Sequence, residues 1–209
     1  MSSVAVIDYG MGNLHSISKA LQHADSRARV IVTDDPRVMS SADRVVLPGV
    51  GAIRDCMHAL SSRDLISVIG ELVREKPFLG ICLGMQALLS DSEENGMTPC
   101  LDIIPGHVRR FSDGLGDGLK IPHMGWNQVH RTHDHPLWSG IADASRFYFV
   151  HSYYACPDRD ADVAATTCYP TPFAVAVATG NVFAVQFHPE KSQAAGLQLL
   201  TNFLSWDPA

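Results

Sequence analysis

The sequence predicts an α/β protein in which helices flank an open, mostly parallel sheet, with additional antiparallel strands and hairpins in the C-terminal half. Two patterns carry this prediction. In the first half of the chain, short apolar runs alternate with segments whose apolar residues repeat at helical spacing. In the second half, closely spaced apolar runs are separated by turn residues. Because 46% of the 209 residues are hydrophobic, we expect one domain with a sizeable core across residues 1–209.

The first half provides the predicted parallel strands and their helices. Apolar runs predict strands at residues 4–8, 29–32, 44–47 and 78–81. Apolar residues recur every three or four positions in residues 14–24 and 65–73, which predicts a helix in each segment. Pro77 ends the second helix because proline cannot continue the helical hydrogen-bond pattern.

Short β-type runs predict the strands of the second half. They lie at residues 147–150, 163–168, 173–177 and 182–187. Gly180 and Asn181 separate the last two runs and are typical of a hairpin turn. A closing helix is predicted from an apolar face made by Leu197, Leu200, Phe203 and Leu204. We expect residues 112–118, which are rich in glycine and aspartate, to form an exposed turn.

Composition excludes several classes of protein. The net charge is −6 and the pI about 5.9, which does not suit a nucleic-acid-binding protein. No apolar run approaches the roughly 20 residues that a membrane span needs, and the N-terminus lacks the positive segment of a signal peptide. The five cysteines are odd in number and widely spaced, so neither a disulfide framework nor a zinc site is expected. A reducing, cytoplasmic setting fits best.

Two motifs that could bind a cofactor or a metal are judged not to do so. Gly10 and Gly12 follow the first strand, but His15 stands where a dinucleotide-binding fingerprint requires glycine. His133 and His135 flank an aspartate, but alternate residues in a polar loop rarely hold a metal. We therefore expect neither a cofactor nor a metal.

The sharpest local feature is a cysteine between two glycines. Cys82 follows an apolar strand and precedes a helical segment, with Gly80 and Gly84 two residues away on either side. This spacing is that of a nucleophile elbow, a tight turn that exposes the nucleophile above the edge of a sheet. The N-terminus of the following helix favours the thiolate form of the cysteine. Cys82 is therefore the predicted nucleophile.

A nucleophilic cysteine needs a base, and the base needs an orienting group. His188 ends the last predicted strand, and Glu190 follows two residues later. The two residues lie in an extended or turning segment, and in a flat strand side chains two residues apart point the same way. We expect Glu190 to accept a hydrogen bond from one ring nitrogen while the other nitrogen faces Cys82.

A glycine-rich turn at the end of another strand is the candidate oxyanion hole. Gly49, Val50 and Gly51 follow Pro48 there. Acyl transfer develops negative charge on the substrate oxygen, and backbone N–H groups without obstructing side chains stabilise it. Leu83, directly after the nucleophile, is the natural second donor.

Together these three segments resemble the class I, triad-type glutamine amidotransferases, and the resemblance covers residues 4–204. It implies that Cys82 attacks the side-chain amide of glutamine, that His188 protonates the departing ammonia, and that a glutamyl thioester is then hydrolysed. It also implies which residues hold the substrate. They are Gly80, Gln86, His151, Ser152 and Tyr153.

Further segments, above all the run from Pro122 to Asn127, resemble the glutaminase subunits of two-chain imidazole glycerol phosphate synthases within that family. This resemblance implies a role in histidine biosynthesis and a separate (β/α)8-barrel cyclase partner that receives the ammonia in a heterodimer. Five positions match those that face the cyclase. They are Asn13, His123, Trp126, Tyr148 and Lys191.

Three alternatives stay open at this point. The chain could serve another synthase, of the anthranilate, aminodeoxychorismate or guanylate type, although those glutaminases are not expected to carry the run from Pro122 to Asn127. It could be a stand-alone γ-glutamyl hydrolase, which would be fully active without a partner. It could also be a non-catalytic binding protein, which the intact Cys82, His188 and Glu190 disfavour.

Overall fold

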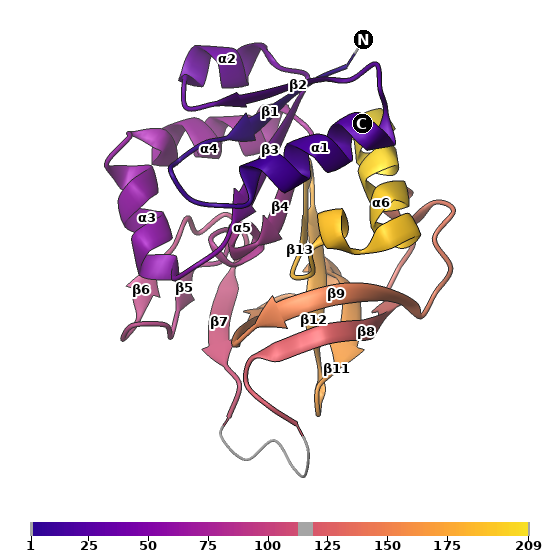
Figure 1. Ribbon diagram of the computed structural model, residues 1–209. Coiled ribbons are helices and arrows are strands. Elements are labelled where there is room, and N and C mark those ends of the chain that lie inside the picture. The colour runs from indigo at the N-terminus through magenta and orange to yellow at the C-terminus, as the bar shows by residue number, and fades with distance from the viewer. Residues whose placement is uncertain (1, 113–118, 209) are drawn as a thin grey trace.

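The computed structural model describes residues 2–112 and 119–208. One 13-stranded sheet runs through them in the order β2-β1-β3-β4-β13-β12-β10-β7-β5-β6, with β11, β8 and β9 attached at β12 (Figure 1). The first five strands in this order are parallel. They are β2 (Arg29–Thr33), β1 (Ser3–Ile7), β3 (Arg44–Gly49), β4 (Phe78–Cys82) and β13 (Val182–Val185). Of the predicted exposed turn at residues 112–118, residues 113–118 lie outside the described residues.

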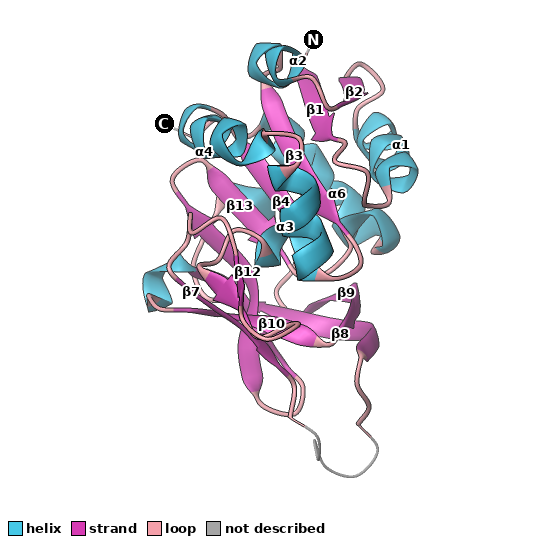
Figure 2. Ribbon diagram, turned by 90° about the vertical axis from the view of Figure 1, so that its left-hand side faces the viewer, coloured by secondary structure: helices cyan, strands magenta, loops and turns pink. Residues whose placement is uncertain are grey.

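Helices cover both faces of the parallel strands (Figure 2). One apolar core contains residues of α1 (Leu14–Ala24) and α6 (Gln193–Ser205), and a second contains residues of α3 (Ile53–Ser61) and α4 (Leu65–Glu75). The short helix α2 (Pro36–Ser41) adds Met39 to the second core. Strands β1, β3, β4 and β13 are almost entirely buried between these two layers, which is why their sequences are continuous apolar runs. Strand β2 lies at the edge of the sheet and is only partly buried.

The mainly antiparallel part, which includes a short parallel pairing of β5 with β7, extends from β13. Its strands are β12 (Pro172–Thr179), β10 (Tyr153–Pro157), β7 (Gly106–Arg110), β5 (Asp91–Ser92), β6 (Thr98–Pro99), β11 (Val163–Cys168), β8 (His123–Arg131) and β9 (Ser145–His151). The short 3-10 helices η1 (Pro136–Trp138) and η2 (Asp160–Asp162) lie between strands of this part, and η3 (Pro189–Lys191) lies between β13 and α6. In Figure 1, β8 and β9 form a curved pair that crosses in front of β12.

The predicted elements are confirmed, with small differences at their ends. The strand predicted at residues 163–168 is β11, and Gly180 and Asn181 join β12 to its antiparallel partner β13. The strand predicted at residues 182–187 ends two residues early, at Val185. Among the described residues, no helix is long and apolar enough to cross a membrane.

The parallel strands bring the predicted reactive segments together. In the pairing of β3 with β4, Gly49 lies opposite Cys82, and β13 pairs with the other side of β4 so that Val185 lies opposite Ile81. The carboxyl ends of parallel strands share one edge of a sheet, where ligands bind in α/β folds. The glycine turn, the cysteine and the segment leading to His188 therefore meet at that edge.

Candidate active site

Cys82 occupies a strained turn between β4 and α5 (Leu83–Gln86). Its φ is 55° and its ψ is −108°, a region that non-glycine residues rarely adopt except where the surrounding structure enforces it. The flanking glycines are required by packing. A β-carbon on Gly84 would overlap the carbonyl oxygen of Leu47, and one on Gly80 would lie 3.0 Å from the β-carbon of Ala184. The elbow thus packs tightly against both neighbouring strands, β3 and β13.

His188 and Glu190 form a buried pair. The Nδ1 atom of His188 lies 2.8 Å from Oε1 of Glu190, and the two side chains are 3% and 2% exposed. Glu190 is in η3, so a tight turn brings the carboxylate to the ring. Nδ1 donates to the carboxylate, which leaves Nε2 for the substrate side. Nε2 is buried and makes no hydrogen bond within the described part of the chain.

The charges around His188 favour its protonated form. Burial by itself lowers the pKa of the imidazole, but the adjacent Cys82 and Glu190 outweigh it and raise the pKa to about 10. An imidazolium beside a cysteine stabilises the thiolate, which is the nucleophilic form. His188 is therefore held in its charged form beside the sulfur of Cys82.

A cavity of about 340 Å³ opens onto these groups, a size suited to an amino-acid substrate. Its lining brings the elbow, the glycine turn and the end of β9 together. It consists of Val50, Gly51, Cys82, Leu83, Gln86, Glu94, Pro122, Val150, His151, Ser152, Tyr153 and His188. Gly80 and Gly49 are not in this lining. Gly80 supports the elbow from behind, whereas Gly49 lies on the other side of the turn, beside Glu190.

The glycine turn is anchored by a tyrosine that the sequence did not single out. The hydroxyl of Tyr9, which is fully buried, donates to the carbonyl of Pro48 at 2.9 Å. A β-carbon on Gly49 would lie 2.8 Å from both that hydroxyl and the β-carbon of Leu83. Gly51 has a φ of +97°, which favours glycine. The turn is therefore held tightly at Gly49, and Val50 after it is 39% exposed.

Sequence reasoning also missed Glu94 and Gln186. Glu94 is the only carboxylate among the described residues that line the cavity, and its Oε2 accepts from the Ile53 backbone N–H at 2.7 Å. Gln186 is fully buried, and its Nε2 lies 3.7 Å from Sγ of Cys82. A glutamine at the end of an apolar run, directly before Phe187 and His188, was the available signal in the sequence.

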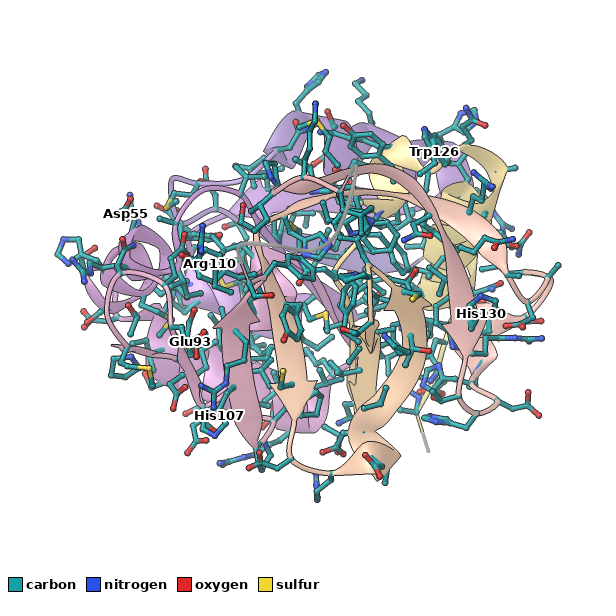
Figure 3. The ribbon with its side chains drawn as sticks, turned by 90° about the horizontal axis from the view of Figure 1, so that it is seen from below. Asp55, Glu93, His107, Arg110, Trp126 and His130 are labelled. Carbon is teal, nitrogen blue, oxygen red and sulfur yellow. The ribbon has the colours of Figure 1, made fainter. Side chains whose placement is uncertain are left out.

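The five predicted partner-facing residues do not all reach the surface. Trp126, which lies at the edge of the view in Figure 3, is 40% exposed, and Lys191 is exposed with its Nζ 5.7 Å from the centre of the Tyr148 ring. Asn13 and Tyr148 are half-buried. His123 differs from its prediction, because its side chain is 3% exposed and points inward from β8. In the described residues, no group of three or more potential ligands is arranged to hold a metal ion.

Comparisons with known proteins agree with this geometry. The glutamine amidotransferase class-I family model matches residues 5–206. The chain is 68% identical to the imidazole glycerol phosphate synthase subunit HisH of Methylococcus capsulatus, with 100% of this chain and 98% of the relative covered. It is 59% identical to the protein of the same name from Nitrosococcus oceani, with 99% of each covered.

Solved structures show the same fold. PurLQS from Thermotoga maritima superposes with a TM-score of 0.73 at 18% identity, covering 98% of both chains. A crystal structure of a glutamine amidotransferase superposes with a TM-score of 0.69 at 17% identity, covering 97% of this chain and 99% of the other. The family match, the relatives and the arrangement around Cys82 lead to one conclusion: the chain belongs to the class I glutamine amidotransferases, in the family of the HisH subunits.

Proposed function

We propose that this chain hydrolyses L-glutamine to glutamate and ammonia as the glutaminase subunit of imidazole glycerol phosphate synthase. The observation that carries the proposal is the buried His188–Glu190 pair, whose free ring nitrogen shares a cavity with Cys82. The triad fits acyl transfer from an amide, and the shared name of relatives at 59% and 68% identity supports the assignment to this synthase. The chain acts as one domain in the cytoplasm, without a cofactor.

The reaction begins with attack of the Cys82 thiolate on the amide carbon of glutamine, forming a carbon–sulfur bond. His188 gives its Nε2 proton to the amide nitrogen, and ammonia departs to leave a γ-glutamyl thioester on Cys82. The neutral His188 then takes a proton from water, whose oxygen attacks the thioester carbon. Cleavage of the carbon–sulfur bond releases glutamate and restores the thiolate. Glu190 holds the ring in the tautomer that both steps require.

The tetrahedral intermediates need hydrogen-bond donors for their oxyanion. The backbone N–H of Leu83 follows the nucleophile at the start of α5, Val50 and Gly51 line the same cavity, and Gly49 packs against Leu83 outside its lining. Because Tyr9 and the elbow hold the turn at Gly49, reorientation of a peptide bond to present an N–H would involve Val50 and Gly51.

The remaining cavity residues suit the other end of glutamine. Glu94 provides a negative charge for the α-ammonium group, and Gln86 together with the segment from His151 to Tyr153 provides polar groups for the carboxylate and the side-chain amide. Ammonia then passes to a (β/α)8-barrel cyclase, which forms imidazole glycerol phosphate and aminoimidazole carboxamide ribotide in histidine biosynthesis. The docking face contains Asn13, Trp126, Tyr148 and Lys191.

The test uses the complex of the chain with the cyclase and two nitrogen sources. Cys82→Ala should abolish synthesis from glutamine but leave synthesis from ammonium salts intact, because Cys82 only generates ammonia. Cys168→Ala is the matched control, since this exposed thiol lies outside the cavity lining, and it should keep both activities. Loss of both activities in a Cys82→Ala complex that still assembles would refute the proposal that Cys82 only generates ammonia for the cyclase.

A further inference from the structure

A chain of hydrogen bonds leads from β8 through two buried histidines to the glutamine cavity. Nδ1 of His151 lies 2.8 Å from the carbonyl oxygen of Tyr153. A carbonyl can only accept, so Nδ1 carries the proton. Nε2 of the neutral His151 ring is then an acceptor, and Nδ1 of His123, 2.9 Å away, must donate to it. One backbone oxygen thus fixes the proton positions on both rings.

The same assignment of donors and acceptors applies to the hydrogen bond at the outer end of this series, between Asn127 and His123. With its proton on Nδ1, the neutral His123 ring has only an acceptor at Nε2, and Nδ2 of Asn127 lies 3.2 Å from it. Nδ2 of Asn127 also donates to the carbonyl of Cys168 at 3.1 Å, so both of its hydrogens are used. Every bond in the chain therefore runs in one direction, from Asn127 toward Tyr153.

Packing keeps both rings neutral. His123 and His151 are 3% and 6% exposed, and the His123 ring stacks on Phe149 and Tyr169 with centroid distances of 4.8 and 4.1 Å. Burial lowers the pKa of His123 to about 4 and that of His151 to about 3. A second proton on either ring would turn the acceptor in the chain into a donor and break it.

At the inner end, the carbonyl of Tyr153 meets the substrate-binding side chains. It also accepts from Nε2 of Gln86 at 3.1 Å, and the same nitrogen donates to Oε1 of Gln186 at 2.9 Å. Both hydrogens of the Gln86 amide are therefore used within the protein. Its carbonyl oxygen is left as an acceptor at the wall of the cavity that Gln86 lines.

We propose that His123 is a positioning residue for glutamine, acting through His151 and the Tyr153 carbonyl to fix the amide of Gln86 with its oxygen available to the substrate. His123 is not itself part of the cavity lining and reaches it through this chain. The inference rests on the proposed glutaminase function, because it assigns a task within that binding site.

Two substitutions separate positioning from mere filling of space. His123→Leu removes the donor to His151, whereas the Nδ2 atom of Asn in His123→Asn can take the place of Nδ1. Glutamine-dependent kinetics are measured on the complex with cyclase, with ammonium-dependent synthesis as the control for folding and assembly. We expect His123→Leu to raise KM for glutamine about tenfold, with a smaller change in kcat, and His123→Asn to restore KM to within about threefold. An unchanged KM in His123→Leu, or equal damage by both substitutions, would overturn the proposal.

A spectroscopic measurement tests the chain of hydrogen bonds from Asn127 to Tyr153 independently of turnover. Nitrogen-15 NMR of the wild-type chain at neutral pH should show His123 and His151 as neutral rings, each with its proton on Nδ1. A proton on Nε2 of either ring, or a cationic ring, would overturn the proposed hydrogen bonding through His123 and His151 even if glutamine hydrolysis proceeds as proposed. Conversely, absence of glutaminase activity from the wild-type complex would reject the proposed function and leave this measurement unaffected.

Discussion

The Nδ1 atom of His188 lies 2.8 Å from Oε1 of Glu190, with both side chains almost completely removed from solvent. This contact fixes the imidazole so that Nε2 is available for the reaction, and together with Cys82 it favours the charged ring. Because the carboxylate orients and stabilises while the ring transfers protons, the two residues should differ in how much activity depends on them.

His188→Asn should therefore reduce glutamine hydrolysis by about 10²–10⁴-fold, the usual contribution of a general acid–base group. Glu190→Gln should cost less, since the ring remains. Both variants should keep ammonium-dependent synthesis when combined with cyclase. Initial rates of glutamate release measure the effect, and near-normal turnover by His188→Asn would show that another group moves the protons.

Tyr9→Phe should lower kcat for glutamine more than it changes KM, because the Tyr9 hydroxyl holds the Pro48 carbonyl at the start of the oxyanion turn. It should also reduce the free energy of unfolding by about 1–3 kcal/mol, the cost of leaving a buried carbonyl without its donor. Tyr154→Phe is the matched control, since this half-buried ring packs on Phe111 instead. Equal effects of both substitutions on kcat would argue against a role for Tyr9 in the turn.

Two glycine substitutions should act in opposite directions on stability. Gly84→Ala places a β-carbon against the Leu47 carbonyl, and overpacking of this kind typically costs about 1–3 kcal/mol. Gly70→Ala, in the interior of α4, meets nothing within 4 Å and should stabilise by about 0.5–1 kcal/mol. Urea unfolding midpoints measure both. A neutral Gly84→Ala would mean that the elbow is not packed as the structure has it.

Acid should destabilise the protein through its buried neutral histidines. The folded-state pKa of His123 is about 4, below its ordinary value of 6.5. The unfolded state therefore binds more protons between these values, and the stability contribution of His123 is complete above pH 6.5 and is lost as pH falls toward 4. His188, with its pKa raised to about 10, has the opposite sign and loses its contribution as pH rises from 6.5 through 10.

The measurement compares free energies of unfolding at pH 7 and pH 5 in the wild type and in His123→Asn. Linkage gives a loss of about 2 kcal/mol for His123 over this interval. The wild type should lose more stability than the variant by about that amount. Identical losses would show that His123 is not held neutral in the folded state.

The sequence predicts α1, α4, α6, the parallel strands and the reactive turns because each leaves a local trace, whereas α2 and α3 were not predicted. Cys82 stands between glycines that the packing demands, and α4 repeats its apolar residues with helical period. Strand β8 leaves no such trace, since Gly125 and Asn127 interrupt it and only its pairing with β9 makes it a strand. The local pattern therefore identified the segment around His123 as a motif, but it did not show that this segment forms a strand.

Roles that arise from long-range contacts were also out of reach. Tyr9 and Pro48 are 39 positions apart, and Gln186 approaches Cys82 from 104 positions away. Nothing in the sequence near His123 shows that a second histidine, His151, will bury it and accept its hydrogen bond. Only the folded arrangement shows that a residue expected to face a partner instead lies behind the substrate cavity.

Covalent capture tests the assignment of Cys82 as the nucleophile most directly. The wild-type chain in complex with cyclase is treated with a glutamine analogue that carries a diazoketone in place of the amide, and the modified residue is located by peptide mass spectrometry. We predict one adduct, on Cys82, that excess glutamine suppresses. Modification of the exposed Cys168 with Cys82 left free would contradict the assignment of Cys82 as the nucleophile.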